Sequence, residues 1–186
     1  MAKRLKRQFF IDDTLKIAKK LLGKNIVVVY KNKKLIGKIV ETEAYIGPID
    51  KASHAYKNKR TKRNYIEYEQ GGRIYIYLVY GLYYQLNLTT NTKGKPECVL
   101  IRALEPIKNI TAETNGPGKL CKALHLNKSF YGEDVTKSKR IWLEDNKDIK
   151  SSLIGHSPRI GINYAGPYWS KRYWRFFIKN NKFVSK

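Results

Sequence analysis

The first regular pattern along the chain is helical. Apolar residues recur at helical spacing from Leu15 to Leu22, directly after Asp12-Asp13-Thr14 and directly before Gly23. A short polar side chain commonly caps the first turn of a helix, and a glycine commonly follows the last. The pattern therefore predicts a helix over residues 13–22.

Most of the remaining apolar residues occur in short, strand-like runs. Asn25–Tyr30 and Leu35–Ala44, joined by the polar turn Lys31–Lys34, predict a hairpin. Further strands are expected over residues 74–80, 82–90, 98–104, 141–143, 159–162 and 175–178. A short helix is expected over residues 119–126. Residues 46–73 form a long predicted loop with a short helix near residues 51–55, and loops of this length usually carry function.

These elements indicate one mixed domain over residues 1–186, with a basic and flexible N-terminal segment at residues 1–10. The two cysteines, Cys98 and Cys121, have no metal-binding spacing, so we expect neither a disulfide framework nor a structural zinc site. We find no secretory signal and no apolar run long enough to cross a membrane. The sequence therefore predicts an intracellular protein in a reducing compartment.

The charge of the chain points to a polyanionic partner. The sequence contains 38 Lys+Arg against 15 Asp+Glu, which gives a net charge of +23. Pairing within the molecule cannot neutralise this excess, so nucleic acid is the first candidate partner and an anionic membrane surface is the second. The alternative is compositional bias, because Lys, Asn, Ile and Tyr are all abundant.

Two acids on one predicted strand are the first candidates for chemistry. Glu41, Glu43 and Tyr45 alternate along the strand and share one face. Asp50 and His54 follow within a few residues, so the segment resembles the rim of an active site. The alternative is that both glutamates lie on a solvated face and that His54 is a structural or surface histidine.

Five tyrosines fall within residues 75–84, more than a protein core usually needs. Aromatic rings beside a basic surface are suited to stacking on nucleobases, although cross-strand packing in a sheet explains them equally well. Residues 57–63 form a basic patch suited to phosphate contact. Gly116-Pro117-Gly118-Lys119 at a predicted helix start offers backbone N–H groups to a phosphate, but it is not a Walker loop.

Together these segments resemble the alkyladenine (3-methyladenine) DNA glycosylase family over nearly the whole chain. The resemblance is carried, in order along the sequence, by Val40–Pro48 with Asp50, Ala52–His54 and Arg63-Asn64, by Tyr75–Tyr83 with Asn87, by Cys98–Pro106, and by Gly116–Leu120 with Asn127–Ser129. The resemblance implies an α+β fold, a single mixed domain with a curved antiparallel β-sheet flanked by helices. It also implies removal of alkylated or deaminated purines from double-stranded DNA.

The resemblance assigns roles to matching positions. Glu43 would activate the attacking water, and Arg102 would help to hold that water or a nearby phosphate. The base pocket would be formed by Tyr45, Ala52, His54, Tyr77 and Asn87. In that pocket the two phenols would stack on the base, His54 and the Ala52 carbonyl would meet its edge, and Asn87 would exclude guanine. Tyr80 would be the intercalating wedge. The DNA backbone would be contacted by Arg63, Tyr83, Gly118 and Lys119.

Elementary chemistry agrees with these roles. A base within a duplex hides its glycosidic bond, so the enzyme must flip it out, and an inserted ring replaces part of the lost stacking. A carboxylate can accept a proton from water and stabilise positive charge on the sugar. Alkylated purines are cationic and gain cation–π attraction between tyrosines. The reaction requires no metal, cofactor or lysine nucleophile, so we expect no strand cleavage.

Two features depart from the longer members of the family. Residues 107–115 form a shorter stretch, so a DNA-facing or surface loop is missing. Glu67 and Glu69 lie in the long loop, where two exposed acids would face phosphates unfavourably.

Two other functions remain open at this stage. A non-catalytic nucleic-acid-binding module explains the charge and the tyrosines, but it gives Glu43 and His54 no purpose. A metal-dependent nuclease using Glu41, Glu43 and Asp50 requires clustered carboxylates. The expected partner is double-stranded DNA with a damaged purine, bound by a monomer with no membrane association. The expected location is the cytoplasm with the bacterial nucleoid, or the nucleus in a eukaryote.

Overall fold

The helix predicted at the N-terminal end is α1, Thr14–Leu21, in the computed structural model, which describes residues 3–185. The Asp13 carboxylate accepts a hydrogen bond from the Lys16 N–H and caps the helix, as the sequence predicts. One face of α1 packs against β2, and Ile17, Ala18 and Leu21 are fully buried there. This burial explains the apolar spacing in the sequence.

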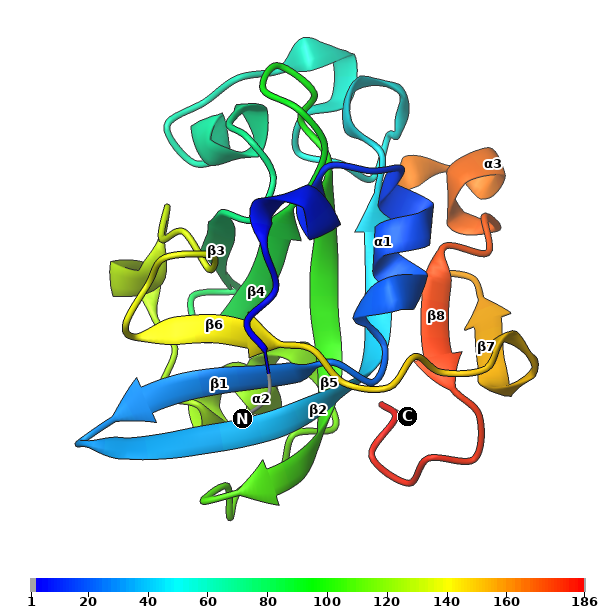
Figure 1. The fold of residues 1–186 in the computed structure, drawn as a ribbon. Helices are drawn as coiled ribbons and strands as arrows, with labels where there is room; N and C mark the ends of the chain where they lie inside the picture. Colours follow the sequence, from blue (N-terminus) through cyan, green and yellow to red (C-terminus); the bar gives the residue numbers. More distant parts are fainter. Residues whose placement is uncertain (1–2, 186) are drawn as a thin grey trace.

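A curled antiparallel sheet forms the centre of the molecule (Figure 1). Its main path runs β3-β4-β5-β2-β1-β6; in addition, β8 pairs with β2, and β7 pairs with β8. The strands are β1 Asn25–Tyr30, β2 Lys33–Tyr45, β3 Ile74–Val79, β4 Tyr83–Thr89, β5 Cys98–Lys108, β6 Ile141–Glu144, β7 Ile154–Ser157 and β8 Arg175–Ile178. The expected α+β fold with a curved antiparallel sheet is confirmed.

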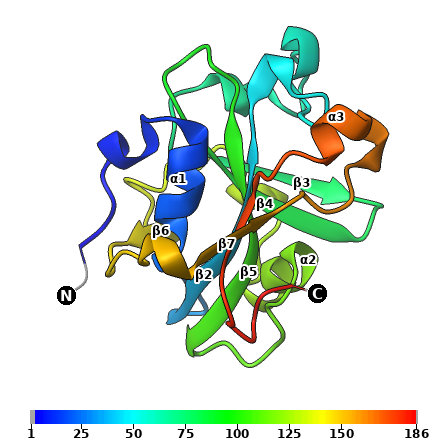
Figure 2. The ribbon, with the colours of Figure 1, turned by 90° about the vertical axis from the view of Figure 1, so that its right-hand side faces the viewer.

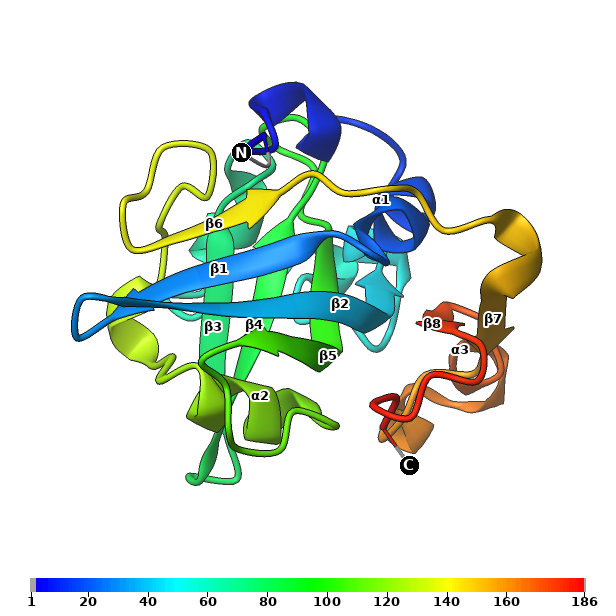
Figure 3. The same cartoon turned by 60° about the horizontal axis from the view of Figure 1, so that its bottom comes forward.

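The long strand β2 produces the curl. Its first part pairs with β1, whereas its last part pairs with β8, and β5 runs along most of its other edge. The pairing with β5 shifts register between Ile39 and Thr42, and such irregularities bend a strand. Figure 3 shows the β1–β2 hairpin crossing β3 and β4 at a steep angle. The bend carries Glu41 and Glu43 into the interior.

Helices cover both sides of the sheet (Figure 2). α1 lies on one side, and α2, Pro117–Ala123, packs on β4 and β5 on the other. The short α3, Pro167–Ser170, lies close to the first residues of β8 (Figure 1). The largest hydrophobic cluster brings together α1, α2 and the strands, so strand faces that would otherwise meet solvent are buried.

Several sequence predictions are wrong in detail. Residues 159–162 form an irregular loop, and the strand of this region is β7, which lies earlier in the chain at Ile154–Ser157. Residues 51–55 form turns between two 3-10 helices, Gly47–Ile49 and Tyr56–Asn58. The helix expected over residues 119–126 begins earlier, at Pro117, because proline is favoured in a first turn.

The N-terminal segment makes specific contacts. Leu5 is buried, Arg4 pairs with Glu144 in an isolated β-bridge, and Arg7 forms an ion pair with Asp134. Residues 1–2 of the segment that we expect to be flexible lie outside the described residues. Among the described helices, none is long and apolar enough to span a membrane.

Candidate active site

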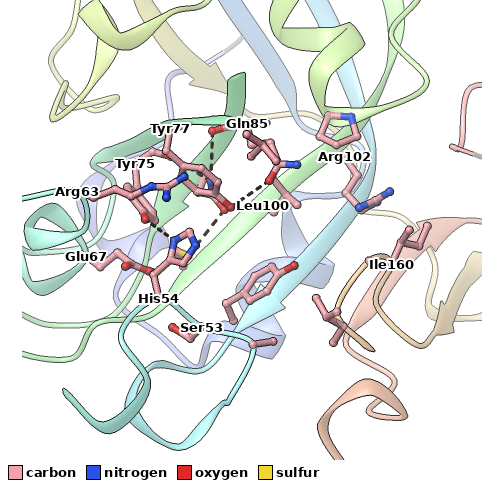
Figure 4. Close-up of a pocket in the computed structure, with 18 of the residues that line it drawn as sticks. Ser53, His54, Arg63, Glu67, Tyr75, Tyr77, Gln85, Leu100, Arg102 and Ile160 are labelled. Carbon is pink, nitrogen blue, oxygen red and sulfur yellow. Dashed lines mark hydrogen bonds between the residues drawn. The ribbon is translucent and has the colours of Figure 1, made fainter. Parts of the chain in front are cut away.

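A cavity of about 340 Å³ opens between the start of α2 and the loop that precedes α3. Its walls come from the end of β2, the long loop, β3, β4 and β5 (Figure 4). The predicted site residues that line it are Tyr45, Ala52, His54, Arg63, Tyr77, Tyr80, Asn87 and Arg102. The fold therefore brings together residues that are up to 57 positions apart in the sequence, from Tyr45 to Arg102.

Glu43 lies directly behind the wall of this cavity and is fully buried. The Tyr45 hydroxyl donates to its Oε2 over 2.9 Å, and the Ile160 N–H donates to its Oε1 over 2.8 Å. Arg102 Nη1 lies 3.3 Å from the same Oε1. All three partners line the cavity, so the carboxylate is held at its edge.

The charge state of Glu43 is set by opposing effects. Burial raises the pKa of Glu43, while Arg102, the Ile160 N–H and the Tyr45 hydroxyl favour the carboxylate and oppose that rise. An ionised carboxylate offers about four lone-pair positions. The contacts above occupy two at Oε1 and one at Oε2, so Oε2 can accept one further hydrogen bond.

Glu41 has a different environment, although it is also fully buried. It accepts from Arg102 Nε at 2.9 Å, from Arg175 Nε at 2.6 Å, and from the backbone N–H and side chain of Ser185. Three of these donors meet Oε1, and the Ser185 N–H meets Oε2. Glu41 therefore positions Arg102 between the two glutamates, and the alternative that both acids lie on a solvated face is wrong.

Asp50 and Arg159 form a second buried ion pair beneath the cavity. Arg159 Nη2 lies 2.9 Å from Asp50 Oδ1, and the Ala52 N–H donates to the same oxygen. The Arg159 guanidinium also stacks on the Tyr45 ring, 4.7 Å from its centre. Because this pair fixes both Ala52 and Tyr45, it shapes one wall of the cavity.

His54 meets Tyr75 inside the cavity. Its Nδ1 lies 2.6 Å from the Tyr75 hydroxyl, and its ring lies edge-on to that of Tyr77 (Figure 4). The residue is exposed through the opening, but the ring is desolvated on its inner side. Burial, helped by the positive charges of Arg63 and Lys59, lowers the pKa of His54 to about 4. The imidazole is therefore neutral at pH 7, and its Nε2 is available to a ligand.

The inner wall holds Tyr77 and Asn87 in fixed orientations. The Tyr77 hydroxyl donates to Gln85 Oε1 over 3.0 Å. Asn87 Nδ2 donates to the Tyr75 carbonyl over 3.1 Å and more weakly to the Gln85 carbonyl. With Nδ2 held in this way, Asn87 Oδ1 accepts a weak hydrogen bond from Cys98 Sγ over 3.9 Å.

The loop at residues 160–164 closes the cavity opposite β3. Tyr164 donates from its hydroxyl to the Ala52 carbonyl over 3.1 Å, so one of the two lone pairs on that oxygen is occupied. The apolar pattern predicts a strand over residues 159–162, so this loop is not among the predicted site residues. The glycine at position 161 is the signal of a turn in the sequence, and in the structure it adopts a φ of +77.

Tyr80 lies at the tip of the β3–β4 hairpin and is 90% exposed. Its φ of +52 is unusual for a bulky residue, which indicates local backbone strain. Leu82 and Tyr83 are also exposed beside it. The tip therefore presents apolar side chains to solvent at the mouth of the cavity.

The other predicted DNA-contacting residues lie around this tip. The Tyr83 ring packs on Gly118, where an added Cβ would come within 2.9 Å of it. Lys119 is exposed and pairs with Glu113 over 3.0 Å. Arg63 donates to the Leu78 carbonyl and stacks on Tyr77, and the basic patch at residues 57–63 is exposed throughout.

Several cavity residues were not among the predicted site residues: Glu67, Tyr75, Gln85, Cys98, Ile160 and Tyr164. Glu67 corrects an expectation, because it is buried in the cavity and does not face outward. Glu69 is half-buried and lies 3.8 Å from Lys93. Within residues 3–185, no group of three acidic, histidine or cysteine side chains is arranged to hold a metal ion.

Comparison with known proteins identifies the family. The family model for methylpurine-DNA glycosylase matches residues 8–182. The chain belongs to the methylpurine-DNA glycosylase family. This membership places it among the DNA glycosylases, which are DNA-repair enzymes.

Individual relatives match over almost their full length. A protein of Clostridium novyi (strain NT) is 47% identical, with 99% of both chains covered, and it carries the provisional name 3-methyladenine DNA glycosylase. A protein of Natranaerobius thermophilus with the same provisional name is 43% identical, with 98% of both chains covered. One from Borrelia garinii is 40% identical, covering 97% of this chain and 98% of its own.

Proposed function

We propose that the protein is a monofunctional 3-methyladenine DNA glycosylase that flips alkylated or deaminated purines out of duplex DNA. The substrates would include 3-methyladenine, 7-methylguanine, hypoxanthine and ethenoadenine, and hydrolysis of their N-glycosidic bond would start base excision repair. The observation that carries the proposal is Glu43, a buried carboxylate held at the edge of an aromatic cavity with one lone-pair position unused.

Flipping requires a wedge and a receiving pocket. Tyr80 would enter the gap left in the duplex, supported by its exposure at the hairpin tip. Tyr45 and Tyr77 would stack on the flipped base, while neutral His54 and the remaining lone pair of the Ala52 carbonyl would meet its polar edge. The Asn87 side chain, whose Nδ2 is held by two backbone carbonyls, would crowd a 2-amino group and disfavour undamaged guanine, whereas the positive charge of 7-methylguanine would let it leave despite this crowding.

Glu43 would then activate water. A water bound at Oε2 would lose a proton to the carboxylate as its oxygen attacks C1′ of the sugar. The electron pair of the glycosidic bond leaves with the base, and the product is an abasic sugar with a new C1′ hydroxyl. A cationic methylpurine leaves as a neutral base and needs no added proton, whereas hypoxanthine or ethenoadenine leaves as an anion and takes up a proton from solvent. Arg102 would orient Glu43 and balance its charge before attack.

Contact with the duplex would follow the exposed cations. Arg63, Lys119 and the N–H groups near Gly118 lie around the tip that carries Tyr80 and Tyr83, so phosphates on either side of the flipped nucleotide would meet them. We propose a monomer on DNA. The proposed location is the cytoplasm, with the bacterial nucleoid, or the nucleus in a eukaryote.

The test is single-turnover release of one hypoxanthine or ethenoadenine from a duplex in EDTA, followed by alkali to cut abasic sites. We expect Glu43→Gln to lower the rate by at least about 100-fold, because the amide cannot take a proton from water. Glu105→Gln, which removes an acid of β5 that pairs with Lys38, is the matched control and should retain activity.

Three results would contradict the proposal. Activity that persists in Glu43→Gln would show that Glu43 does not activate the attacking water. Strand breaks before alkali would indicate lyase chemistry. No release of any lesion, including methylpurines from alkylated DNA, would favour a non-catalytic binding module. The nuclease alternative is already disfavoured, because arginines pair with Glu41 and Asp50.

A further inference from the structure

Glu67 is the acid in the cavity that the mechanism does not use. It lies in the 3-10 turn Tyr65–Tyr68, lines the cavity and is 1% exposed. Its Oε1 accepts a hydrogen bond from Cys98 Sγ over 3.3 Å. Its Oε2 is buried and has no hydrogen-bond partner among residues 3–185. Buried polar atoms are rarely left unpaired, so this oxygen indicates a ligand.

The surroundings of Glu67 are aromatic and weakly polar. Cys98, Tyr75 and Tyr77 face it from the two strands of the inner wall, and Tyr131 approaches from the loop after α2. Glu67 forms no ion pair within the described part of the chain. Burial raises the pKa of Glu67 to about 7, while the Cys98 thiol and the Asn64 side chain partly oppose the rise. A cationic ligand is the partner that this carboxyl lacks.

Charge balance around the cavity supports the same conclusion. The buried acids Glu41, Glu43 and Asp50 are matched by three arginines: Arg102, Arg159 and Arg175. Arg63 adds a further positive charge at the mouth, over Tyr77. Without Glu67 the cavity would have an excess of positive charge, which would repel a cationic base.

We propose that Glu67 is a specificity-determining residue whose carboxylate, at the inner end of the cavity, selects cationic purines over neutral purines of similar size. The inference rests on the proposed function for its substrate class, methylated purines that carry a positive charge. A cationic base would attract the Glu67 carboxylate in a site shielded from water, where such attraction is strong. A neutral base would leave the carboxyl without a charged partner. The base would stack beside Tyr77, close to His54 and Tyr75, where Figure 4 shows Glu67.

Binding of free bases tests the inference without requiring catalysis. The probes are the 7,9-dimethyladeninium cation and neutral 9-methyladenine, titrated by calorimetry into the full chain at about pH 8, where Glu67 is ionised. Wild type should prefer the cation. We expect Glu67→Gln to lose about tenfold of that preference, with the loss confined to the cation. Glu69→Gln removes an acid two positions away, outside the cavity, and should leave the preference unchanged.

Glu67→Met is a second variant of similar length, and circular dichroism reports whether each variant is folded. The inference predicts the same loss in Glu67→Met. Equal preference in wild type and both folded variants would overturn it, as would a wild type that binds the two probes equally or binds neither. If the variants weaken only the neutral probe, Glu67 acts as a neutral hydrogen-bond donor, and the inference is also wrong.

An excision assay separates this inference from the proposed function. The ratio of 3-methyladenine release from alkylated DNA to hypoxanthine release from a defined duplex should fall about tenfold in Glu67→Gln and stay constant in Glu69→Gln. An unchanged ratio in an active variant overturns the inference and leaves the glycosylase intact. A wild type that releases neither base overturns the proposed function, while the binding preference still decides the role of Glu67.

Discussion

Two regions of the cavity bury acids in opposite ways. Beside β2 and β8, Glu41, Glu43 and Asp50 are each held by arginines and backbone N–H groups. Facing the inner wall, Glu67 is equally buried, but its polar contacts among residues 3–185 are the Cys98 thiol and the Asn64 side chain, with no arginine or lysine beside it. We call the first region the arginine-paired wall and the second the Glu67 wall.

The two walls differ in whether the charge and orientation of their acids are fixed. Paired charges are fixed in place, so the arginine-paired wall gives Glu43 one orientation toward the cavity. An unpaired carboxyl responds to what enters, because its charge state depends on its neighbours. A site that must position one acid and recognise a charge with another uses both environments.

The largest expected effect comes from breaking the arginine-paired wall. Arg159→Met would leave Asp50 buried without its partner, and breaking a buried ion pair in this way lowers the free energy of unfolding by about 3–5 kcal/mol. Urea unfolding measures this loss. The matched control is Arg140→Met, whose half-exposed pair with Glu133 should contribute less than about 1 kcal/mol. Similar losses in the two variants would show that burial does not distinguish these pairs.

The next effect is the pH dependence of the Glu67 wall. The pKa of Glu67 is about 7 in the folded protein and 4.5 as the ordinary value, so the folded state binds the proton more tightly. The protonated Glu67 therefore contributes to the free energy of unfolding. This contribution is fully present below about pH 4.5 and is lost, by up to about 3 kcal/mol, as pH rises through about 7. Unfolding free energies of wild type and Glu67→Gln, measured across this range, should converge at low pH and diverge at high pH in favour of the variant.

His54 acts in the opposite direction. Its pKa is lowered, so the folded state resists protonation and stability falls as pH drops through the ordinary value of 6.5 toward 4. The pH-dependent contributions of Glu67 and His54 to stability therefore partly cancel in the wild type. The difference in unfolding free energy between wild type and Glu67→Gln isolates the contribution of the Glu67 carboxyl. Glu69→Gln is the control, and a parallel pH profile in Glu67→Gln and wild type would contradict the raised pKa.

The sequence predicts only part of the arginine-paired wall. Alternation along a strand correctly places Glu43 and Tyr45 on one side, where their side chains hydrogen-bond. It does not reveal that Arg159 and Arg175, more than 100 positions away, neutralise Asp50 and Glu41. Long-range pairing depends on how β8 docks on β2, and no local pattern encodes that.

The Glu67 wall shows a different limit. Local composition predicts an exposed loop at residues 46–73, since it is rich in charge, but Ile66 and Glu67 turn inward on a 3-10 turn. Strands β1, β2 and β8 follow their apolar runs, whereas residues 159–162 contain apolar side chains because they face the cavity. Runs of apolar residues therefore do not distinguish a strand from a loop that closes a cavity.

The smallest expected effect lies outside both walls, at the hairpin tip. Tyr80 has left-handed backbone geometry, which glycine adopts without strain and alanine does not. Tyr80→Gly should therefore be more stable than Tyr80→Ala by up to about 1 kcal/mol in urea unfolding. Both variants lose the ring, so both should lose excision equally if Tyr80 is the wedge. Equal free energies of unfolding for the two variants would contradict backbone strain at Tyr80. Wild-type excision rates in both variants would contradict the role of Tyr80 as the wedge. If Tyr80→Gly is more stable than the wild type but inactive, the strained backbone at the tip is kept because excision requires the Tyr80 ring.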